Sequence, residues 1–207
     1  YYFRHASSIE GKVIDEFSGS LPEPAVAQFI ERILPKPGSA EYKKAQMLVD
    51  IGDEENAIAQ LRQILRDHPE HGPSRVLLSS LLLDRGQTDD AQKVFARLKD
   101  KEISDPTALS VAARLRIRTD AVPVEEAKAT VEANPKSAAA LINYGRSLVA
   151  AQDYEQGLRH LLEAVQLGEG DEIQEARSAM LESFEILGNT NPLVREFRGR
   201  LSMVLFQ

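Results

Sequence analysis

The sequence predicts a mostly α-helical protein built from tandem helical repeats. A short pattern recurs after 34 residues: Ile51-Gly52-Asp53 with Ala57 returns as Arg85-Gly86-Gln87 with Ala91, and more weakly as Ala151-Gln152-Asp153 with Gly157. From Ser39 onward, apolar residues also recur at helical spacing, and the connections between these segments are short and carry Gly, Asp or Pro. A 34-residue period is typical of stacked helix pairs, which form an extended binding surface.

Residues 1–38 have a different character. Aromatic and β-branched residues on both sides of Gly11-Lys12 predict a β-hairpin over 1–19. Ser20 is then a plausible N-cap for a helix over 20–34, whose apolar face would hold Val26, Phe29, Ile30, Ile33 and Leu34. Pro35-Lys36-Pro37-Gly38 ends this helix and serves as a linker. Because the chain starts with Tyr1 in what reads as the middle of a strand, we expect it to be a fragment.

Ten helices are expected after the linker, at about 39–51, 53–67, 73–86, 88–99, 106–119, 123–133, 137–151, 153–167, 170–187 and 191–206. Small residues at 57, 91, 145 and 157 should let neighbouring helix backbones approach closely. The third pair is irregular, since its second helix is short and ends at Asn134-Pro135. With this period and these positions, the segment resembles tetratricopeptide repeats.

Composition excludes several functions. A net charge of -7 disfavours nucleic acid as a partner, and no apolar run approaches the length of a membrane helix. The chain has no cysteine, so it offers no thiol chemistry of its own. His68 and His71 flank a proline at a helix end and are interpreted as solvated loop residues, not as metal ligands. We expect no catalytic residue, cofactor or metal.

Other charged and glycine-rich segments have structural explanations. Arg114, Arg116 and Arg118 alternate along a helix, which favours a solvated face over a basic site for an acidic partner. Acidic residues at helix starts, such as Asp53 and Asp89-Asp90, are interpreted as caps. Gly168-Glu169-Gly170 follows a helix and is interpreted as a helix stop, not as a phosphate-binding loop.

A groove along the first helices of the repeats is the first candidate binding site. The Lys and Asn residues with which some tetratricopeptide proteins grip a chaperone's terminal carboxylate are not at the corresponding positions. The expected lining is partly apolar: Tyr42, Val49, Val76, Leu83, Ile142 and Val149. Two interpretations stay open, because these residues either contact a protein partner or lie under terminal helices.

The last expected helix is the second candidate. Apolar residues recur at helical spacing to the end of the chain, whereas an ordinary solenoid cap has a polar outer face. Phe197, Leu201, Leu205 and Phe206 therefore either pack inward as a cap or dock a partner.

The hairpin, the linker, the repeats and the closing Phe197-Arg198-Gly199-Arg200-Leu201 together resemble the bacterial chaperedoxins of the CnoX/YbbN type, in which a thioredoxin-fold domain precedes a tetratricopeptide domain. Residues 1–35 look like the last two strands and final helix of the thioredoxin fold, and 36–207 look like the helical domain. The resemblance implies a cytoplasmic, ATP-independent holdase that binds unfolding or oxidation-prone clients and passes them to the GroEL/ES chaperonin, which would dock on residues 191–207.

Redox activity is not implied for this chain, because the Cys-x-x-Cys region of a thioredoxin is absent from it. Two other hypotheses remain open. The repeats either select substrates for a thiol oxidoreductase or form a scaffold within one fixed complex.

Overall fold

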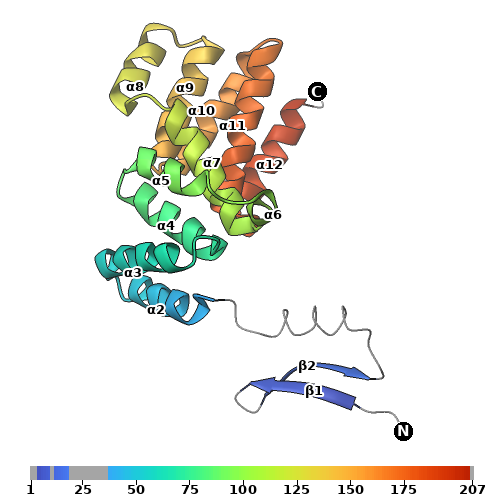
Figure 1. Cartoon of the computed structure of the whole chain (residues 1–207). Coiled ribbons are helices and arrows are strands. Elements are labelled where there is room, and N and C mark those ends of the chain that lie inside the picture. The colour runs from blue at the N-terminus through green and yellow to red at the C-terminus, as the bar shows by residue number, and fades with distance from the viewer. Residues whose placement is uncertain (1–3, 10–11, 19–36, 206–207) are drawn as a thin grey trace. The chain divides into compact units, whose positions relative to one another are not determined.

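The computed structural model describes residues 4–9, 12–18 and 37–205 (Figure 1). Contacts divide the chain into two compact units, Tyr1–His71 and Gly72–Gln207. The predicted domain boundary after residue 35 and the predicted helix over 20–34 lie outside the described residues and stay predictions.

The first unit begins with the predicted hairpin. Strands β1 (Arg4–Ile9) and β2 (Lys12–Ser18) pair antiparallel, from Arg4 opposite Ser18 to Ile9 opposite Lys12. The register shifts between Ser7 and Ser8, which is the signature of a β-bulge. Lys12, expected in the turn, belongs to the ladder. Nothing in this two-stranded ladder tests its assignment to a thioredoxin fold.

The first unit ends with one helical pair, α2 (Ser39–Asp50) and α3 (Glu54–Asp67), which pack against each other. The buried residues of this pair are small or branched: Ala45, Ala57, Ile58, Leu61 and Ile64. Ala57 is fully buried, as expected for a position of close helix approach.

The second unit is entirely helical in its described part. Its helices are α4 (Gly72–Asp84), α5 (Thr88–Phe95), α6 (Asp100–Ile103), α7 (Pro106–Asp120), α8 (Val124–Ala133), α9 (Ala138–Ala150), α10 (Tyr154–Leu167), α11 (Asp171–Leu187) and α12 (Pro192–Leu205). All ten predicted helices are present. The prediction missed α6 and extended α5 by four residues, to 99.

The repeated tripeptides form one kind of turn. At the end of α4, Gly86 N–H donates to Leu83 O (2.9 Å) and Gln87 N–H donates to Leu82 O (2.8 Å). The turns after α2 and α9 have the same two bonds, which satisfy the last carbonyls of each helix. In two of the three turns, the next residue, Asp53 or Asp153, then accepts a bond from the following helix. The repeat in sequence is therefore a repeated helix stop and start.

Gln152 occupies the middle position of its turn, where the other two turns have glycine. Gly52, Gly86 and Gln152 all have a positive φ, of 80°, 74° and 67°. A side chain in this left-handed region costs about 1 kcal/mol relative to glycine. We expect Gln152→Gly to raise the free energy of unfolding by about 0.5–1 kcal/mol in urea titrations. Gly52→Ala, at a position with no atom near the added Cβ, should lower it by a similar amount.

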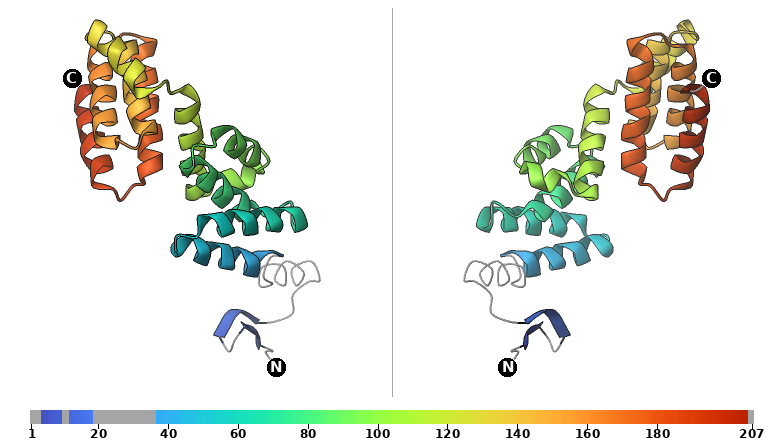
Figure 2. Two further views of the ribbon diagram at one scale, coloured as in Figure 1. Left: turned by 90° about the vertical axis from the view of Figure 1, so that its left-hand side faces the viewer. Right: turned by 90° about the vertical axis from the view of Figure 1, so that its right-hand side faces the viewer.

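The core of the second unit lies among α7 and α9–α12, and α9–α12 run side by side in Figure 2. Its largest fully buried side chains include Phe184 and Phe197. Helices α9 and α10 approach so closely that a Cβ on Gly157 would lie 2.9 Å from Gly145 O, and a Cβ on Gly145 would lie 3.0 Å from Gly157 O. The prediction that small residues at 145 and 157 allow this approach is confirmed.

Helix α7 departs from the repeat pattern. It packs against α4, α5, α9 and α11, whereas α8 packs against α9, so α7 and α8 do not form an ordinary helical hairpin. Buried residues occur on several sides of α7: Ala108, Val111, Ala112, Ala113, Leu115 and Ile117. A helix that is apolar on several sides belongs inside a protein. Helix α7 therefore joins α4 and α5 to the bundle of α9–α12.

Candidate functional site

The predicted groove is largely filled. Of its six predicted lining residues, Val76, Leu83, Ile142 and Val149 are buried, and the last three are at most 2% exposed. Their assignment to an open protein-binding groove is wrong. Tyr42 and Val49, in the first unit, are partly exposed, and the Tyr42 ring contacts the ring of His71 at 5.4 Å.

Helix α7 contributes to the burial in the second unit, because it lies beside Val149 of α9 and its Arg118 donates to Leu83 O of α4. Ile117 of α7 belongs to the same core cluster as Ile142 and Val149 of α9. Ser110 Oγ of α7 donates to Ile186 O of α11 at 3.5 Å, and Arg116 pairs with Glu182 of α11 at 3.2 Å. Val149, which was expected to line an open groove, lies instead beside a helix of the same chain.

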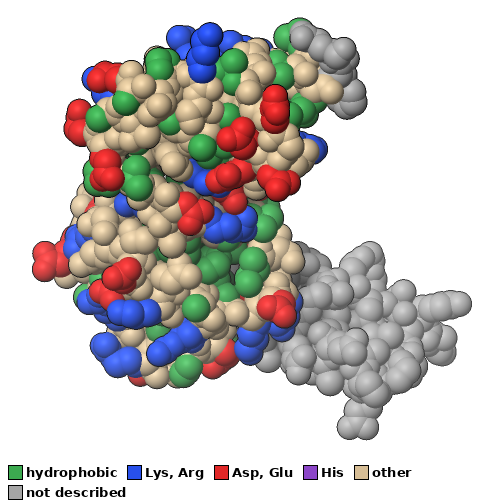
Figure 3. All heavy atoms as spheres, turned by 90° about the horizontal axis from the view of Figure 1, so that it is seen from above, with side chains coloured by type: hydrophobic (Ala, Val, Ile, Leu, Met, Phe, Trp, Pro, Cys, Tyr) green, Lys and Arg blue, Asp and Glu red, His purple; other side chains and the backbone are tan. Residues whose placement is uncertain are grey.

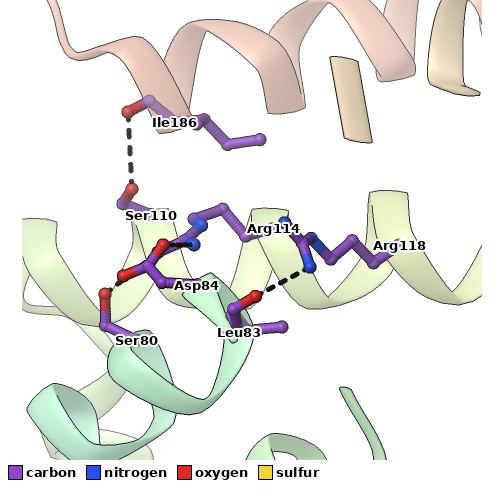
Figure 4. A network of polar contacts seen from close by, with 7 residues as sticks. All are labelled: Ser80, Leu83, Asp84, Ser110, Arg114, Arg118 and Ile186. Atoms are coloured by element: carbon purple, nitrogen blue, oxygen red, sulfur yellow. Dashed lines mark hydrogen bonds and ion pairs between the residues drawn. The ribbon is translucent and has the colours of Figure 1, made fainter. Parts of the chain in front are cut away.

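The three arginines of α7 are structural and do not form one solvated face. Arg114 pairs with Asp84 and donates to Ser80 Oγ (2.9 Å), and Arg118 donates to Leu83 O (2.7 Å) (Figure 4). Both contacts hold the C-terminal end of α4, where main-chain carbonyls favour a cation. Arg114 and Arg118 contact α4, whereas Arg116, between them in the sequence, pairs with Glu182 of α11.

The C-terminal helix is a cap along most of its length. Val194, Phe197 and Leu201 are buried in the core cluster. Arg200 lies over the Phe197 ring (4.9 Å from its centroid), and Arg198 lies over the Phe184 ring (5.5 Å). Docking of a partner on Phe197 and Leu201 is therefore excluded in this conformation, because their side chains already fill the interior.

The last turn of α12 is different. Leu205 is 37% exposed, and Met203, which the sequence analysis did not select, is 61% exposed. Phe206 lies outside the described residues. Met203 and Leu205 lie two residues apart, on different sides of the last turn, and are defined here as the exposed apolar tip of α12.

The histidines, acidic residues and glycines considered in the sequence analysis have structural roles or form no site in the part of the chain that the structure describes. His71 is buried rather than solvated, which corrects its interpretation as a loop residue. No group of three or more His, Asp or Glu side chains in residues 37–205 is placed to hold a metal ion. Asp53 caps α3, and Gly168 and Gly170 lie between α10 and α11, as predicted. Basic and acidic side chains are interspersed on the face shown in Figure 3.

None of the described helices is both long enough and apolar enough to cross a membrane.

The described helices and their repeated turns agree with comparisons with known families. One family model, described as Tetratricopeptide repeat, matches residues 48–115, and a second model with the same description matches residues 117–206. Both segments are tetratricopeptide repeats. Stacked repeats of this kind bind other proteins along their exposed helix faces, so the chain is a protein-interaction scaffold.

Similar solved structures include MamA from Desulfovibrio magneticus RS-1. It is 16% identical, with 83% of this chain and 94% of that chain covered and a TM-score of 0.37. The MamA RS-1 ArsTM double mutant gives the same identity and TM-score, with 83% and 96% covered. A comparison with curated proteins found no match. The tetratricopeptide assignment rests on the two family matches and on the helices themselves.

Proposed function

We propose that this protein is an ATP-independent co-chaperone that binds unfolding or oxidation-prone proteins and passes them to the GroEL/ES chaperonin. The proposal combines a repeat scaffold with the resemblance of residues 1–19 and 197–201 to chaperedoxins. It places the protein in the cytoplasm, where the chaperonin works. The chain carries no cysteine and so contributes no thiol chemistry of its own to this function.

The observation that carries the proposal is the apolar tip of α12. A terminal repeat helix normally ends in a polar outer face, because a cap must be soluble. Here Met203 and Leu205 are exposed while the preceding turns of the same helix are packed inward. Exposed apolar side chains at the end of a rigid helix are suited to an apolar groove on a partner. The chaperonin contact is therefore assigned to the tip and no longer to Phe197 and Leu201.

Client proteins need a separate apolar surface. Met47 of α2 and Ile51, the residue directly after α2, are four positions apart and are 57% and 76% exposed. A short apolar stripe of this kind fits weak binding of extended, partly unfolded chains. The client surface is therefore assigned to α2 in the first unit, and the chaperonin contact to α12 in the second.

Two measurements test the proposal. Light scattering of a thermally aggregating client should decrease when the protein is added without ATP, and immobilised protein should retain GroEL. Unchanged aggregation of the client would contradict the holdase function. Loss of only the chaperonin interaction would leave a scaffold that binds clients.

The double variant Met203→Ser and Leu205→Ser should lose most GroEL retention, because it removes the apolar tip. Its unfolding midpoint in urea should fall only modestly, because Met203 is mostly exposed and only Leu205, at 37% exposure, loses part of its packing. Leu181→Ser is the matched control, because Leu181 is 45% exposed but belongs to α11 and not to the tip. Equal retention by the double variant and the parent would contradict the assignment of docking to α12.

A further inference from the structure

The three methionines of the chain differ in their exposure to solvent. Met47 of α2 is 57% exposed and Met203 of α12 is 61% exposed. Met180 of α11 is fully buried in the core cluster. Methionine commonly fills gaps in protein cores, as Met180 does, so the two exposed methionines are the unusual ones.

The exposed methionines belong to the two apolar surfaces assigned above. Met203 forms the apolar tip of α12 together with Leu205, and Met47 forms the apolar stripe of the first unit together with Ile51. Among the exposed large apolar side chains of the described residues, Met47 and Met203 alone contain sulfur. Each surface therefore pairs one aliphatic side chain, which mild oxidants do not attack, with one thioether, which they do.

The composition of the chain directs a mild oxidant to these thioethers. The sequence contains no cysteine and no tryptophan, so the thiol and indole groups that would compete for the oxidant are missing from it. Oxidation of methionine to the sulfoxide converts a flexible apolar side chain into a polar one. At an exposed position this change alters the binding surface and leaves the core intact.

We propose that Met47 and Met203 are oxidation sites, at which hydrogen peroxide converts the thioether to the sulfoxide and weakens both apolar surfaces. In each step the O–O bond of the peroxide breaks, one oxygen forms the S–O bond, and the other leaves as water with both protons. The sulfur is oxidised by two electrons and the peroxide is reduced by two. Burial protects Met180 in the folded bundle.

The consequence for binding rests on the proposed function, because it requires that the tip docks on GroEL and that the stripe holds clients. A sulfoxide at position 203 leaves Leu205 as the one apolar member of the tip. The Kd for GroEL should then rise by about five- to thirtyfold, the effect of losing one anchoring side chain from an interface. Methionine sulfoxide reductases restore the thioether, so the change is reversible.

Peptide mapping by mass spectrometry tests the two sites without any partner. The full chain is treated with hydrogen peroxide, the excess is removed with catalase, and the sulfoxide is measured at each methionine over time. Met47 and Met203 should be oxidised well before Met180, and this difference should disappear in urea, where the chain is unfolded. Equal rates at all three positions in the folded chain would overturn the assignment.

GroEL binding by treated and untreated protein tests the consequence at the tip. The oxidised parent should bind about five- to thirtyfold more weakly, and treatment with the reductases should restore its affinity. Met203→Leu keeps an apolar side chain of similar size that cannot be oxidised, so it should bind equally before and after peroxide. Met203→Gln, which is polar like the sulfoxide, should bind weakly without peroxide. Loss of binding by peroxide-treated Met203→Leu would place the damage elsewhere and overturn the proposal.

Met47→Leu is the corresponding variant for clients. After peroxide it should still suppress the light scattering of an aggregating client, whereas the treated parent should suppress it less. An untreated parent that neither retains GroEL nor slows aggregation would contradict the proposed function itself. If the untreated parent binds and its binding is unchanged after complete oxidation of Met47 and Met203, this inference alone is wrong.

Discussion

Replacing Gly157 with alanine is expected to lower the free energy of unfolding by about 2 kcal/mol. The new Cβ would lie 2.6 Å from Val149 Cγ2, 2.9 Å from Gly145 O and 3.1 Å from Val149 N. Two of these three atoms belong to the backbone of α9, so the helices must separate along their contact. Overpacking of this kind typically costs about 1–3 kcal/mol and falls here at the upper end. The gain of about 1 kcal/mol from better helix propensity does not offset it.

Gly199→Ala is the matched control, because Gly199 is also inside a helix but a Cβ there would meet no atom within 4 Å. Only the propensity term remains, so this variant should gain about 0.5–1 kcal/mol. Urea unfolding followed by circular dichroism measures both variants. Opposite signs would show that close packing of α9 on α10 sets the need for Gly157. A gain in stability by both variants would show that α9 and α10 do not pack closely enough to require glycine at position 157.

The helices and turns were predictable because their signals are local. Gly52 and Gly86 are needed for a positive φ at a helix stop, and the Asp residues that follow two of the turns are needed for the next helix start. Such signals lie within a few residues and recur with the repeat. Helix α6 has only four residues and gave no periodic signal. Its Glu102 side chain lies directly over Gly72 at the start of α4, a contact that sequence spacing does not reveal.

The candidate sites were less predictable, because an apolar stripe indicates a contact but not the partner in that contact. Ile142 and Val149 have the spacing of a groove lining, yet both are buried in the core of the same chain, where Val149 lies beside Ile117 of α7. The sequence did contain one indication that α7 would be buried. Residues 108–117 place Ala, Val, Leu and Ile on several sides of one helix, which indicates a helix buried on several sides and not an ordinary repeat helix.

Phe197→Ala is expected to have the largest effect on stability, a loss of about 3–5 kcal/mol. The Phe197 side chain is fully buried in the core cluster of the second unit, and its removal leaves a cavity that rigid helices cannot close. The contact with Arg200 would be lost as well. For a domain with a total stability of about 5–15 kcal/mol, this loss is severe. Deleting residues 193–207 would remove Phe197 together with Val194 and Leu201 and should unfold the bundle.

Phe197→Leu separates packing from partner binding at the same position. Leucine keeps most of the buried volume, so the expected loss of stability is below about 1.5 kcal/mol. Because the ring faces the interior and the apolar tip is unchanged, GroEL retention by Phe197→Leu should equal that of the parent. Retention is compared at a temperature where circular dichroism shows both proteins folded. A folded Phe197→Leu protein that no longer binds the chaperonin would mean that α12 must leave the bundle to dock, and the assignment of Phe197 to the cap would then describe only the unbound state.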